Sequence, residues 1–195
     1  PLAELASFDG ILVPGGFGTR GVLGKLNVIR YAREKKIPYF GICYGMQLAI
    51  IEYAQNVLGF KDASSREIDP SSKKIIIDIM ESQKENIKNN KMGGSMRLGS
   101  YPAVLKKGTI AHSAYGTNTI DERHRHRFEV SPIYIPELEK AGLVFSGKSP
   151  DGTLMEIVEL PKKDHPFFLG AQFHPEFQAH PLHPHKLFTA FIKAA

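Results

Sequence analysis

The first sixty residues alternate between short apolar runs and longer segments with apolar residues at helical spacing. The pattern predicts strands over residues 8–13 and 37–42 and helices over residues 25–36 and 46–57. Two strands separated by a helix pair in parallel, because a tight turn can join only antiparallel neighbours. The order therefore predicts an α/β fold, a three-layer sandwich with helices on both faces of a mainly parallel central sheet.

The rest of the chain is richer in predicted strands, and it shows no internal repeat. The polar segment 81–94 reads as the most mobile loop. At 195 residues, the length fits a single domain. Further strands are expected over residues 74–80, 95–105, 143–147, 153–160 and 166–173, and further helices over residues 136–141 and 185–193.

Composition narrows the class of protein. Hydrophobic residues make up 42% and charged residues 23%, which excludes disordered, fibrous and coiled-coil proteins. No apolar run is long enough to cross a bilayer and no signal peptide is recognisable, so we expect no membrane partner. The single cysteine, Cys43, fits a reducing, cytoplasmic location. A net charge of +5 without a long basic stripe predicts no nucleic-acid partner.

Cys43 is the candidate nucleophile, at the centre of a Gly-x-Cys-x-Gly sequence between a predicted strand and a predicted helix. On so sharp a turn, side chains at positions 41 and 45 would collide with their surroundings, and Gly41 and Gly45 leave room. The positive end of the helix predicts a lowered thiol pKa. The alternative is that Cys43 is a small buried apolar residue, as free cysteines usually are.

His174 and Glu176 follow the last predicted strand, in the sequence His-Pro-Glu. A cysteine nucleophile needs an imidazole as general acid and base, and a carboxylate to orient the imidazole. In an extended segment residues i and i+2 point the same way, so Glu176 is expected to reach the ring. His174 should meet Cys43, because both follow strands of a parallel sheet. The tripeptide alone is more typical of a plain loop, but together with the cysteine turn these residues predict a Cys-His-Glu triad.

The glycine-rich loop 14–18 follows the first predicted strand at the same edge of the sheet. Its glycines let backbone N–H groups turn inward, so the N–H groups of Gly16 and Tyr44 are expected to stabilise an oxyanion. A phosphate-binding loop is the alternative. That alternative lacks the Gly-Lys-Ser/Thr ending, and residues 16–21 are predicted to lead into more loop instead of directly into a helix.

Together these motifs resemble the class I glutamine amidotransferases of the triad type, and within them the C-terminal glutaminase domains of the CTP synthases. The resemblance implies a flavodoxin-like fold. It also implies that residues 1–195 are one glutaminase domain, which lacks an N-terminal strand and helix and a preceding synthase domain. The segments that carry the resemblance are Val-Pro-Gly-Gly-Phe-Gly (13–18), Gly-Ile-Cys-Tyr-Gly-Met-Gln (41–47), Gly-Ser-Met-Arg-Leu-Gly (94–99), Glu-Arg-His-Arg-His-Arg-Phe-Glu-Val (122–130) and Gln-Phe-His-Pro-Glu-Phe (172–177).

The resemblance implies hydrolysis of L-glutamine to glutamate and ammonia through a thioester on Cys43, with His174 and Glu176 completing the triad. The ammonia would go to the synthase domain, a ligase that aminates UTP to CTP in pyrimidine biosynthesis. ATP and Mg²⁺ are expected only in that partner domain, with no cofactor or metal here. The family also implies GTP as an activator and a homo-oligomeric full-length enzyme.

The resemblance further assigns a glutamine pocket. In it, a carboxylate at Glu67 suits the α-ammonium of glutamine and a guanidinium at Arg127 suits its α-carboxylate. From the residues alone, solvated surface charge is the preferred interpretation of both. The family usually has Leu at the position of Tyr44, so the wall of the glutamine pocket is expected to differ here. It usually has Glu at the position of Leu23, in a loop tied to activation by GTP, so the response to GTP is expected to differ as well. The assigned pocket residues are Gly16, Tyr44, Gly45, Met46, Gln47, Glu67 and Arg127.

The sequence also contains two clusters of basic residues, and it leaves two alternative functions open. Residues 123–127, Arg-His-Arg-His-Arg, are expected to form one wall of the active site with internal ion pairs. His180, His183 and His185 are expected in a surface loop without metal, because no Cys or carboxylate completes a site. Two alternatives stay open: a γ-glutamyl hydrolase or cysteine peptidase of related fold, and an inactive binding or regulatory module.

Overall fold

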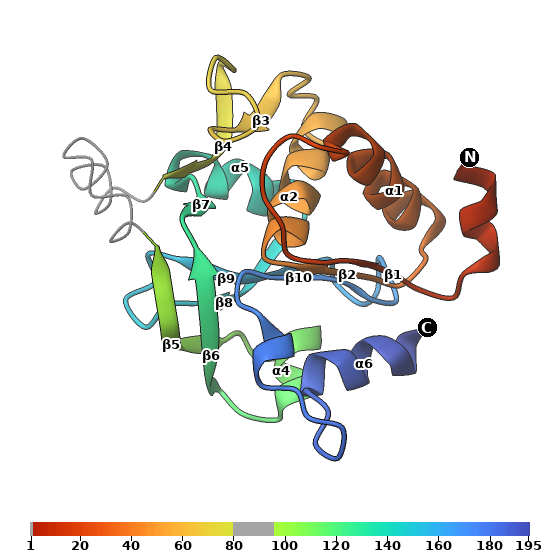
Figure 1. Ribbon diagram of the computed structural model, residues 1–195, viewed down its shortest axis with the longest axis vertical. Coiled ribbons are helices and arrows are strands. Elements are labelled where there is room, and N and C mark those ends of the chain that lie inside the picture. Colours follow the sequence, from red (N-terminus) through yellow and green to blue (C-terminus); the bar gives the residue numbers. More distant parts are fainter. Residues whose placement is uncertain (1, 80–95) are drawn as a thin grey trace.

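The computed structural model describes residues 2–79 and 96–195, which form a three-layer α/β sandwich (Figure 1). The predicted loop 81–94 and the end of the predicted strand at Met80 lie outside the described residues. The central sheet has the strand order β1-β2-β10-β9-β8-β5-β6. Its strands are β1 (Ile11–Val13), β2 (Tyr39–Ile42), β10 (Phe168–Ala171), β9 (Met155–Glu159), β8 (Val144–Lys148), β5 (Arg97–Leu105) and β6 (Thr119–His126).

The sheet is mixed, so the expectation of a mainly parallel sheet is only partly confirmed. Strands β1, β2 and β10 run parallel, whereas every pair from β10 to β6 is antiparallel. The parallel part contains β1 and β2, which α1 connects, and β10, which pairs with β2 although it comes much later in the chain. The antiparallel part contains strands joined by shorter links, such as the turn at residues 149–152 between β8 and β9, where Gly152 N–H donates to Ser149 O. Short links of this kind favour antiparallel neighbours.

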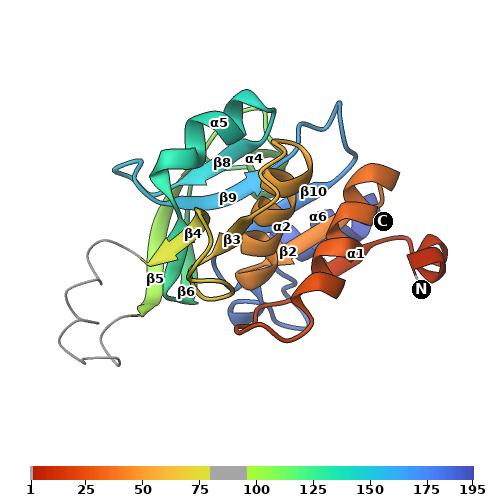
Figure 2. The same ribbon diagram turned by 90° about the horizontal axis from the view of Figure 1, so that it is seen from above.

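Helices cover both faces of the sheet and enclose two apolar cores (Figures 1 and 2). Helices α1 (Val22–Lys35), α2 (Tyr44–Asn56) and α5 (Ile135–Lys140) lie on one face, and α4 (Ile110–Tyr115) and α6 (Lys186–Ala194) lie on the other. A second sheet, ordered β3-β4-β7, packs beside α2. The remaining elements are β3 (Ala63–Ser65), β4 (Lys74–Ile79), β7 (Phe128–Val130) and the 3-10 helices η1 (Leu2–Ser7), η3 (Pro132–Tyr134) and η4 (Pro175–Phe177).

Every predicted element is found at its expected place, with bounds that differ by a few residues at most. The sequence prediction missed β3, α4, β6 and β7. It also placed the start of α1 too late. That helix begins at Val22, directly after Gly21, so the glycine-rich loop does lead straight into a helix.

Strand β6 was missed although its burial alternates strictly along the chain. The alternation points His124 and His126 inward and Arg123 and Arg125 outward, as the two-residue period of a strand requires. The sequence Arg-His-Arg-His therefore carried a strand signal in its alternation of residue types.

The histidine-rich loop before α6 divides into exposed and buried parts. His180 and His183 are exposed and pair through their backbones. His185 is buried, contrary to the expected surface loop: its Nδ1 accepts from Leu187 N–H to cap α6, and its Nε2 lies 2.9 Å from Glu122 Oε1. Among residues 2–79 and 96–195, no group of three or more His, Cys, Asp or Glu side chains is placed to hold a metal ion.

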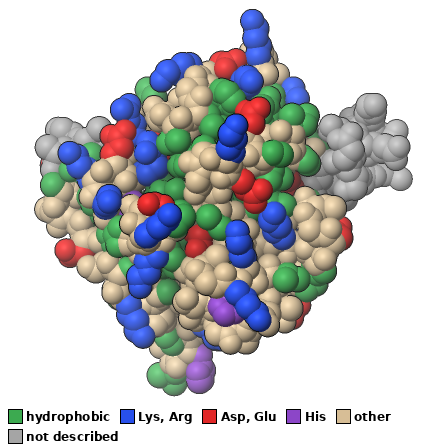
Figure 3. Space-filling model, turned by 180° about the vertical axis from the view of Figure 1, so that it is seen from behind, with side chains coloured by type: hydrophobic (Ala, Val, Ile, Leu, Met, Phe, Trp, Pro, Cys, Tyr) green, Lys and Arg blue, Asp and Glu red, His purple; other side chains and the backbone are tan. Residues whose placement is uncertain are grey.

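The distribution of charged side chains on the surface and the length of the helices are relevant to nucleic-acid and membrane partners. Seen from behind, Lys and Arg side chains are dispersed among apolar and acidic groups and do not form a single stripe on that face (Figure 3). None of the described helices has both the length and the apolar character needed to cross a bilayer.

His165 is buried with both ring nitrogens occupied, which predicts a pH-dependent stability. Its Nε2 donates to Ala32 O at 3.1 Å, and its Nδ1 accepts from Phe167 N–H at 3.2 Å. Burial lowers the pKa of His165, because a charged imidazolium is costly to bury, and the neutral ring is the form that satisfies both bonds. The unfolded chain therefore binds this proton first, and the stability that the neutral ring supplies above about pH 6.5 is lost as the pH falls.

We expect the stability advantage of the native chain over His165→Gln to shrink by about 1 kcal/mol between pH 7.5 and pH 5.5. Urea unfolding of both proteins at several pH values measures it. Because all other titrating groups are common to both proteins, their contributions cancel. An advantage that stays constant or grows on acidification would contradict a neutral His165.

Candidate active site

Cys43 occupies a strained turn between β2 and α2. Its backbone has φ 49° and ψ −99°, and it directly precedes the first residue of α2. A positive φ is unusual for a residue other than glycine and is found most often where a functional side chain must be presented. The backbone N–H of Cys43 donates to Ala171 O at 2.6 Å, which ties the turn to β10.

Both flanking glycines are required by the surrounding backbone, as expected. A Cβ on Gly41 would lie 2.7 Å from the carbonyl carbon of Gly45. A Cβ on Gly45 would lie 2.2 Å from the carbonyl oxygen of Val13 in β1. Because these contacts are with backbone atoms, no side-chain rotation could relieve them. The Gly-x-Cys-x-Gly prediction of a tightly packed turn is confirmed.

His174 follows β10, the parallel neighbour of β2, in which Ala171 pairs with Ile42. The two candidate residues therefore leave the sheet at the same edge, as the sequence predicted. His174 N–H donates to Arg123 O at 2.8 Å, and its ring stacks on Phe177 with the ring centroids 4.8 Å apart. The backbone of His174 is thus held by β6, and its ring packs on η4.

Glu176 contacts the imidazole through Nδ1, with Oε1 2.6 Å away. The contact is confirmed, but the expected extended geometry is wrong. Pro175 starts the 3-10 helix η4, whose turn brings Glu176 back to the ring. Although partial burial acts to raise it, the hydrogen bond from His174 brings the pKa of Glu176 below its ordinary value. An ionised Glu176 stabilises the tautomer that leaves Nε2 free to accept a proton.

Cys43, His174 and Glu176 line one cavity of about 610 Å³. The Cys43 residue is only 5% exposed, so the sulfur lies at the floor of the cavity. His174 Nε2 is buried and has no hydrogen-bond partner among the described residues. The other lining residues are Pro14, Gly15, Gly16, Phe17, Gln47, Glu67, Met96, Arg125, His126, Arg127, Phe128 and Phe177.

The pKa of Cys43 is shifted opposite to the sequence-based expectation. Burial raises the pKa of the Cys43 thiol to about 12, and the carboxylates of Glu129, Glu176 and Glu67 add to the shift. The Tyr44 backbone N–H at the start of α2 opposes the rise, but it is outweighed. The resting group is therefore a thiol, and a reaction at neutral pH needs a base beside it.

The glycine-rich loop closes one side of the cavity. A Cβ on Gly15 would lie 2.8 Å from Cε1 of His174, so the loop packs directly against the imidazole. Gly16 lines the cavity, and the Tyr44 N–H faces the sulfur from the start of α2. These two positions are the ones expected to present oxyanion donors.

The assigned substrate residues divide into two groups. Gly16, Gln47, Glu67 and Arg127 line the cavity. Glu67 accepts from Gly18 N–H at 3.1 Å, and Arg127 Nε is buried with no hydrogen-bond partner among the described residues. The remaining assigned residues, Tyr44, Gly45 and Met46, are buried beneath the cavity and are not part of its lining.

The basic run does form part of the cavity wall, through Arg125, His126 and Arg127. Among the described residues, the buried ion pairs beside this run are formed by Arg97, and the arginines of the run form none. Arg97 Nη1 lies 2.8 Å from Glu156 Oε1 and 3.6 Å from Glu129 Oε1. His124 Nδ1 and His126 Nε2 lie 2.9 Å apart. Burial, followed by the charge of Arg97, lowers the pKa of His126 to about 3.

One residue beside the nucleophile was not singled out from sequence. Gln172 is fully buried, its Nε2 lies 3.6 Å from Cys43 Sγ, and its Oε1 accepts from Gln47 Nε2 at 3.2 Å. The two amides thus form a buried chain of contacts that ends at the sulfur. The available signal was a polar residue within the otherwise apolar run 167–173.

A larger cavity of about 820 Å³ lies elsewhere, between α4, α6 and the loop after β9. Lysines line it, and its one acidic residue, Glu159, already accepts from Ile110 and Ala111 N–H. Neither Cys43 nor His174 reaches it. The smaller cavity is the one that brings together Cys43, His174 and Glu176, the candidate nucleophile, base and orienting carboxylate.

Comparisons with known proteins agree with this geometry. The family model described as "Glutamine amidotransferase class-I" matches residues 1–194. A CTP synthase of Nitratidesulfovibrio vulgaris is 55% identical over 199 residues, covering 98% of this chain and 36% of the relative. A CTP synthase of Acidobacterium capsulatum is 57% identical over 192 residues, covering 98% and 34%. The chain thus spans about a third of the length of these relatives.

Solved structures show the same relationship. The glutaminase domain of Trypanosoma brucei CTPS with bound acivicin superposes with a TM-score of 0.91 at 41% identity, covering 99% of this chain and 73% of that one. A GMP synthase subunit of Thermoplasma acidophilum superposes with a TM-score of 0.60 at 17% identity, covering 99% of this chain and 75% of that one, which shows a shared fold.

Proposed function

The chain belongs to the class I glutamine amidotransferase family, and from this premise we propose that it is the glutaminase part of a CTP synthase. The observation that carries the proposal is the single cavity that joins Cys43, His174 and Glu176 with Glu67 and Arg127. The first three groups supply acyl-transfer chemistry. The other two suit the ends of a free amino acid.

In the acylation step, Cys43 Sγ attacks the side-chain amide carbon of glutamine. His174 Nε2 takes the thiol proton as the carbon–sulfur bond forms, which is required because the thiol pKa is about 12. The developing oxyanion accepts hydrogen bonds from the Gly16 and Tyr44 N–H groups. The imidazolium then protonates the amide nitrogen, the carbon–nitrogen bond breaks, and ammonia leaves a γ-glutamyl thioester on Cys43.

In the deacylation step, neutral His174 removes a proton from water, which attacks the thioester carbon. The tetrahedral intermediate collapses to glutamate, and the imidazolium returns the proton to the departing sulfur. Glu176 keeps the imidazole oriented and stabilises its charged form in both steps. This sequence uses side chains and water alone, so we propose that this part of the protein needs no cofactor or metal.

Substrate selection follows from the two charged lining residues. Glu67 faces the α-ammonium and Arg127 the α-carboxylate, and a buried guanidinium nitrogen without a partner gains most from an anionic ligand. A protein substrate would bring amides in place of these charges, whereas the γ-glutamyl residue of a γ-glutamyl peptide keeps both α groups and differs only in what its γ-carbonyl carries. The two charged residues therefore favour a free α-amino-acid end, such as that of L-glutamine, over a peptidase substrate, and the similarity to CTP synthases favours glutamine over a γ-glutamyl peptide.

The resemblance to the CTP synthases implies further roles for the whole enzyme. We propose that the ammonia passes to a synthase region that uses ATP and Mg²⁺ to aminate UTP, in a cytoplasmic homo-oligomer. GTP is the proposed activator, although Leu23, exposed on the first turn of α1, stands where the family usually has Glu.

Labelling with acivicin tests the proposal. We expect mass spectrometry to find one adduct, on Cys43, and L-glutamine to slow its formation while L-asparagine does not. Cys43→Ala should give no adduct, and the native chain should release glutamate from glutamine. A folded chain that stays unlabelled, or an adduct on another residue, would rule out the proposed chemistry.

A further inference from the structure

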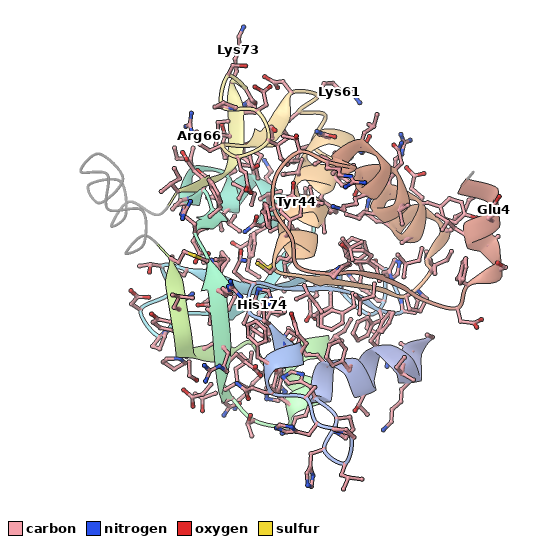
Figure 4. The ribbon with its side chains drawn as sticks, in the orientation of Figure 1. Glu4, Tyr44, Lys61, Arg66, Lys73 and His174 are labelled. Atoms are coloured by element: carbon pink, nitrogen blue, oxygen red, sulfur yellow. The ribbon has the colours of Figure 1, made fainter. Side chains whose placement is uncertain are left out.

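The side chain of Tyr44 does not enter the glutamine cavity but lies under the glycine-rich loop. The Tyr44 hydroxyl donates to Gly18 O, and the residue as a whole is only 2% exposed. A Cβ on Gly16 would lie 3.4 Å from Tyr44 Cδ1, so the ring also supports the part of the loop that lines the cavity. In Figure 4, Tyr44 lies on the inner side of the loop that runs from β1 to α1, with His174 below it.

The loop has few other restraints. Within the described part of the chain, the hydrogen bonds made by residues 14–18 both fall on Gly18: its carbonyl accepts from Tyr44, and its N–H donates to Glu67. Gly18 has φ +74°, which glycine adopts without strain. The loop is therefore held at one residue, from below by Tyr44 and from the cavity side by Glu67.

The position of this loop matters for two reacting groups. Gly15 packs on the ring of His174, and Gly16 lines the cavity at the expected oxyanion position. An oxyanion donor acts only when it is held close to where the charge develops, and displacement by about 1 Å can cost up to about a hundredfold in rate.

We propose that the Tyr44 hydroxyl is a positioning group for catalysis, which holds the glycine-rich loop so that Gly16 N–H faces the oxyanion. The inference rests on the proposed glutaminase function. It assigns the side chain of Tyr44 a role separate from that of its backbone N–H, which faces the sulfur.

The environment of Tyr44 keeps its hydroxyl protonated, so the hydroxyl can act as a hydrogen-bond donor throughout the working pH range. Burial and the nearby Glu67 raise the pKa of Tyr44 to about 12, so the hydroxyl keeps its proton throughout the working pH range. The ammonium of Lys25 lies 5.3 Å from the ring centroid and adds a contact from α1. The ring is thereby joined both to the loop, through Gly18 O, and to the helix that follows the loop.

Tyr44→Phe removes only the hydroxyl, and Tyr53→Phe is the matched control. Tyr53 lies on the same helix, and its hydroxyl likewise donates to a backbone carbonyl, Ala141 O at 2.6 Å, away from the cavity. We expect Tyr44→Phe to lower kcat for glutamine hydrolysis by about 10- to 100-fold with KM changed less than about twofold. Tyr53→Phe should keep the native kcat, and both should lose similar thermal stability.

A second measurement does not depend on activity. Hydrogen exchange followed by mass spectrometry should show faster exchange in the peptide that covers residues 14–20 of Tyr44→Phe only. Unchanged exchange there, or an unchanged kcat in an active native chain, would overturn the positioning role. If the native chain does not hydrolyse glutamine, the proposed function fails, and the exchange data alone decide whether Tyr44 holds the loop.

Discussion

Replacing His174 with Ala is expected to slow the acylation of Cys43 at pH 7 by about a thousandfold. The thiol has a pKa of about 12 and is almost wholly protonated at that pH, so acylation depends on a base that removes the proton during attack. General base catalysis by a positioned imidazole contributes about 10²- to 10⁴-fold. The rate of acivicin labelling, followed by mass spectrometry, measures this step without requiring turnover.

The pH dependence of the same variant gives a sharper test. Without His174 only the free thiolate reacts, and its fraction rises tenfold for each pH unit below the thiol pKa of about 12. We therefore expect the labelling rate of His174→Ala to climb about tenfold per pH unit between pH 7 and pH 10. The native chain should respond far less in that range.

His183→Ala is the matched control, since His183 is exposed and its described hydrogen bonds use its backbone. It should label at the native rate. If His174→Ala labelled as fast as the native chain at pH 7, or lost its labelling at every pH while remaining folded, His174 would not be the base.

Gly45→Ala is expected to cause the largest loss of stability of any single methyl addition in the described chain, about 3 kcal/mol or more. The new Cβ would lie 2.2 Å from the carbonyl oxygen of Val13, so β1 and the start of α2 would have to separate. The measurement is the free energy of unfolding in urea, or the soluble yield where the variant does not fold.

Gly24→Ala adds the same methyl group within α1, where no atom lies within 4 Å of the new Cβ. It should stabilise the chain by about 0.5–1 kcal/mol, because alanine favours a helix over glycine. Equal stability of Gly45→Ala and the native chain would mean that β1 does not pack on the turn as described.

Much of the candidate site could be predicted from short stretches of the sequence. The contact that requires Gly41 is with Gly45 in the same turn, whereas the contact that requires Gly45 is with Val13 of β1, so the motif predicted the need for glycine but not that second partner. The contact of His174 with Glu176 spans two residues, so short-range geometry suffices, even though the segment is a 3-10 turn and not extended. The meeting of Cys43 and His174 followed from the general rule that parallel strands end at one edge.

Other features of the site and the fold could not be predicted from the sequence, because they depend on parts of the chain that are far apart. The thiol pKa reflects burial by several elements and carboxylates at 67, 129 and 176, none near Cys43 in sequence. Whether a strand pairs in parallel or antiparallel depends on its neighbour, which the antiparallel half of the sheet shows. The direction of the Tyr44 side chain depends on a loop 26 residues away.

The order of amino acids was sufficient to identify the family, the succession of the main elements and three candidate catalytic residues, Cys43, His174 and Glu176, which line one cavity. These follow from residue types and spacings within short segments, where backbone geometry leaves few choices. Packing in three dimensions was needed for the mixed sheet, the protonated thiol, the amide contact of Gln172 and the place of Tyr44 beneath the glycine-rich loop. Each of these depends on which distant segments lie together, because burial and electrostatic interaction act through space and not along the chain.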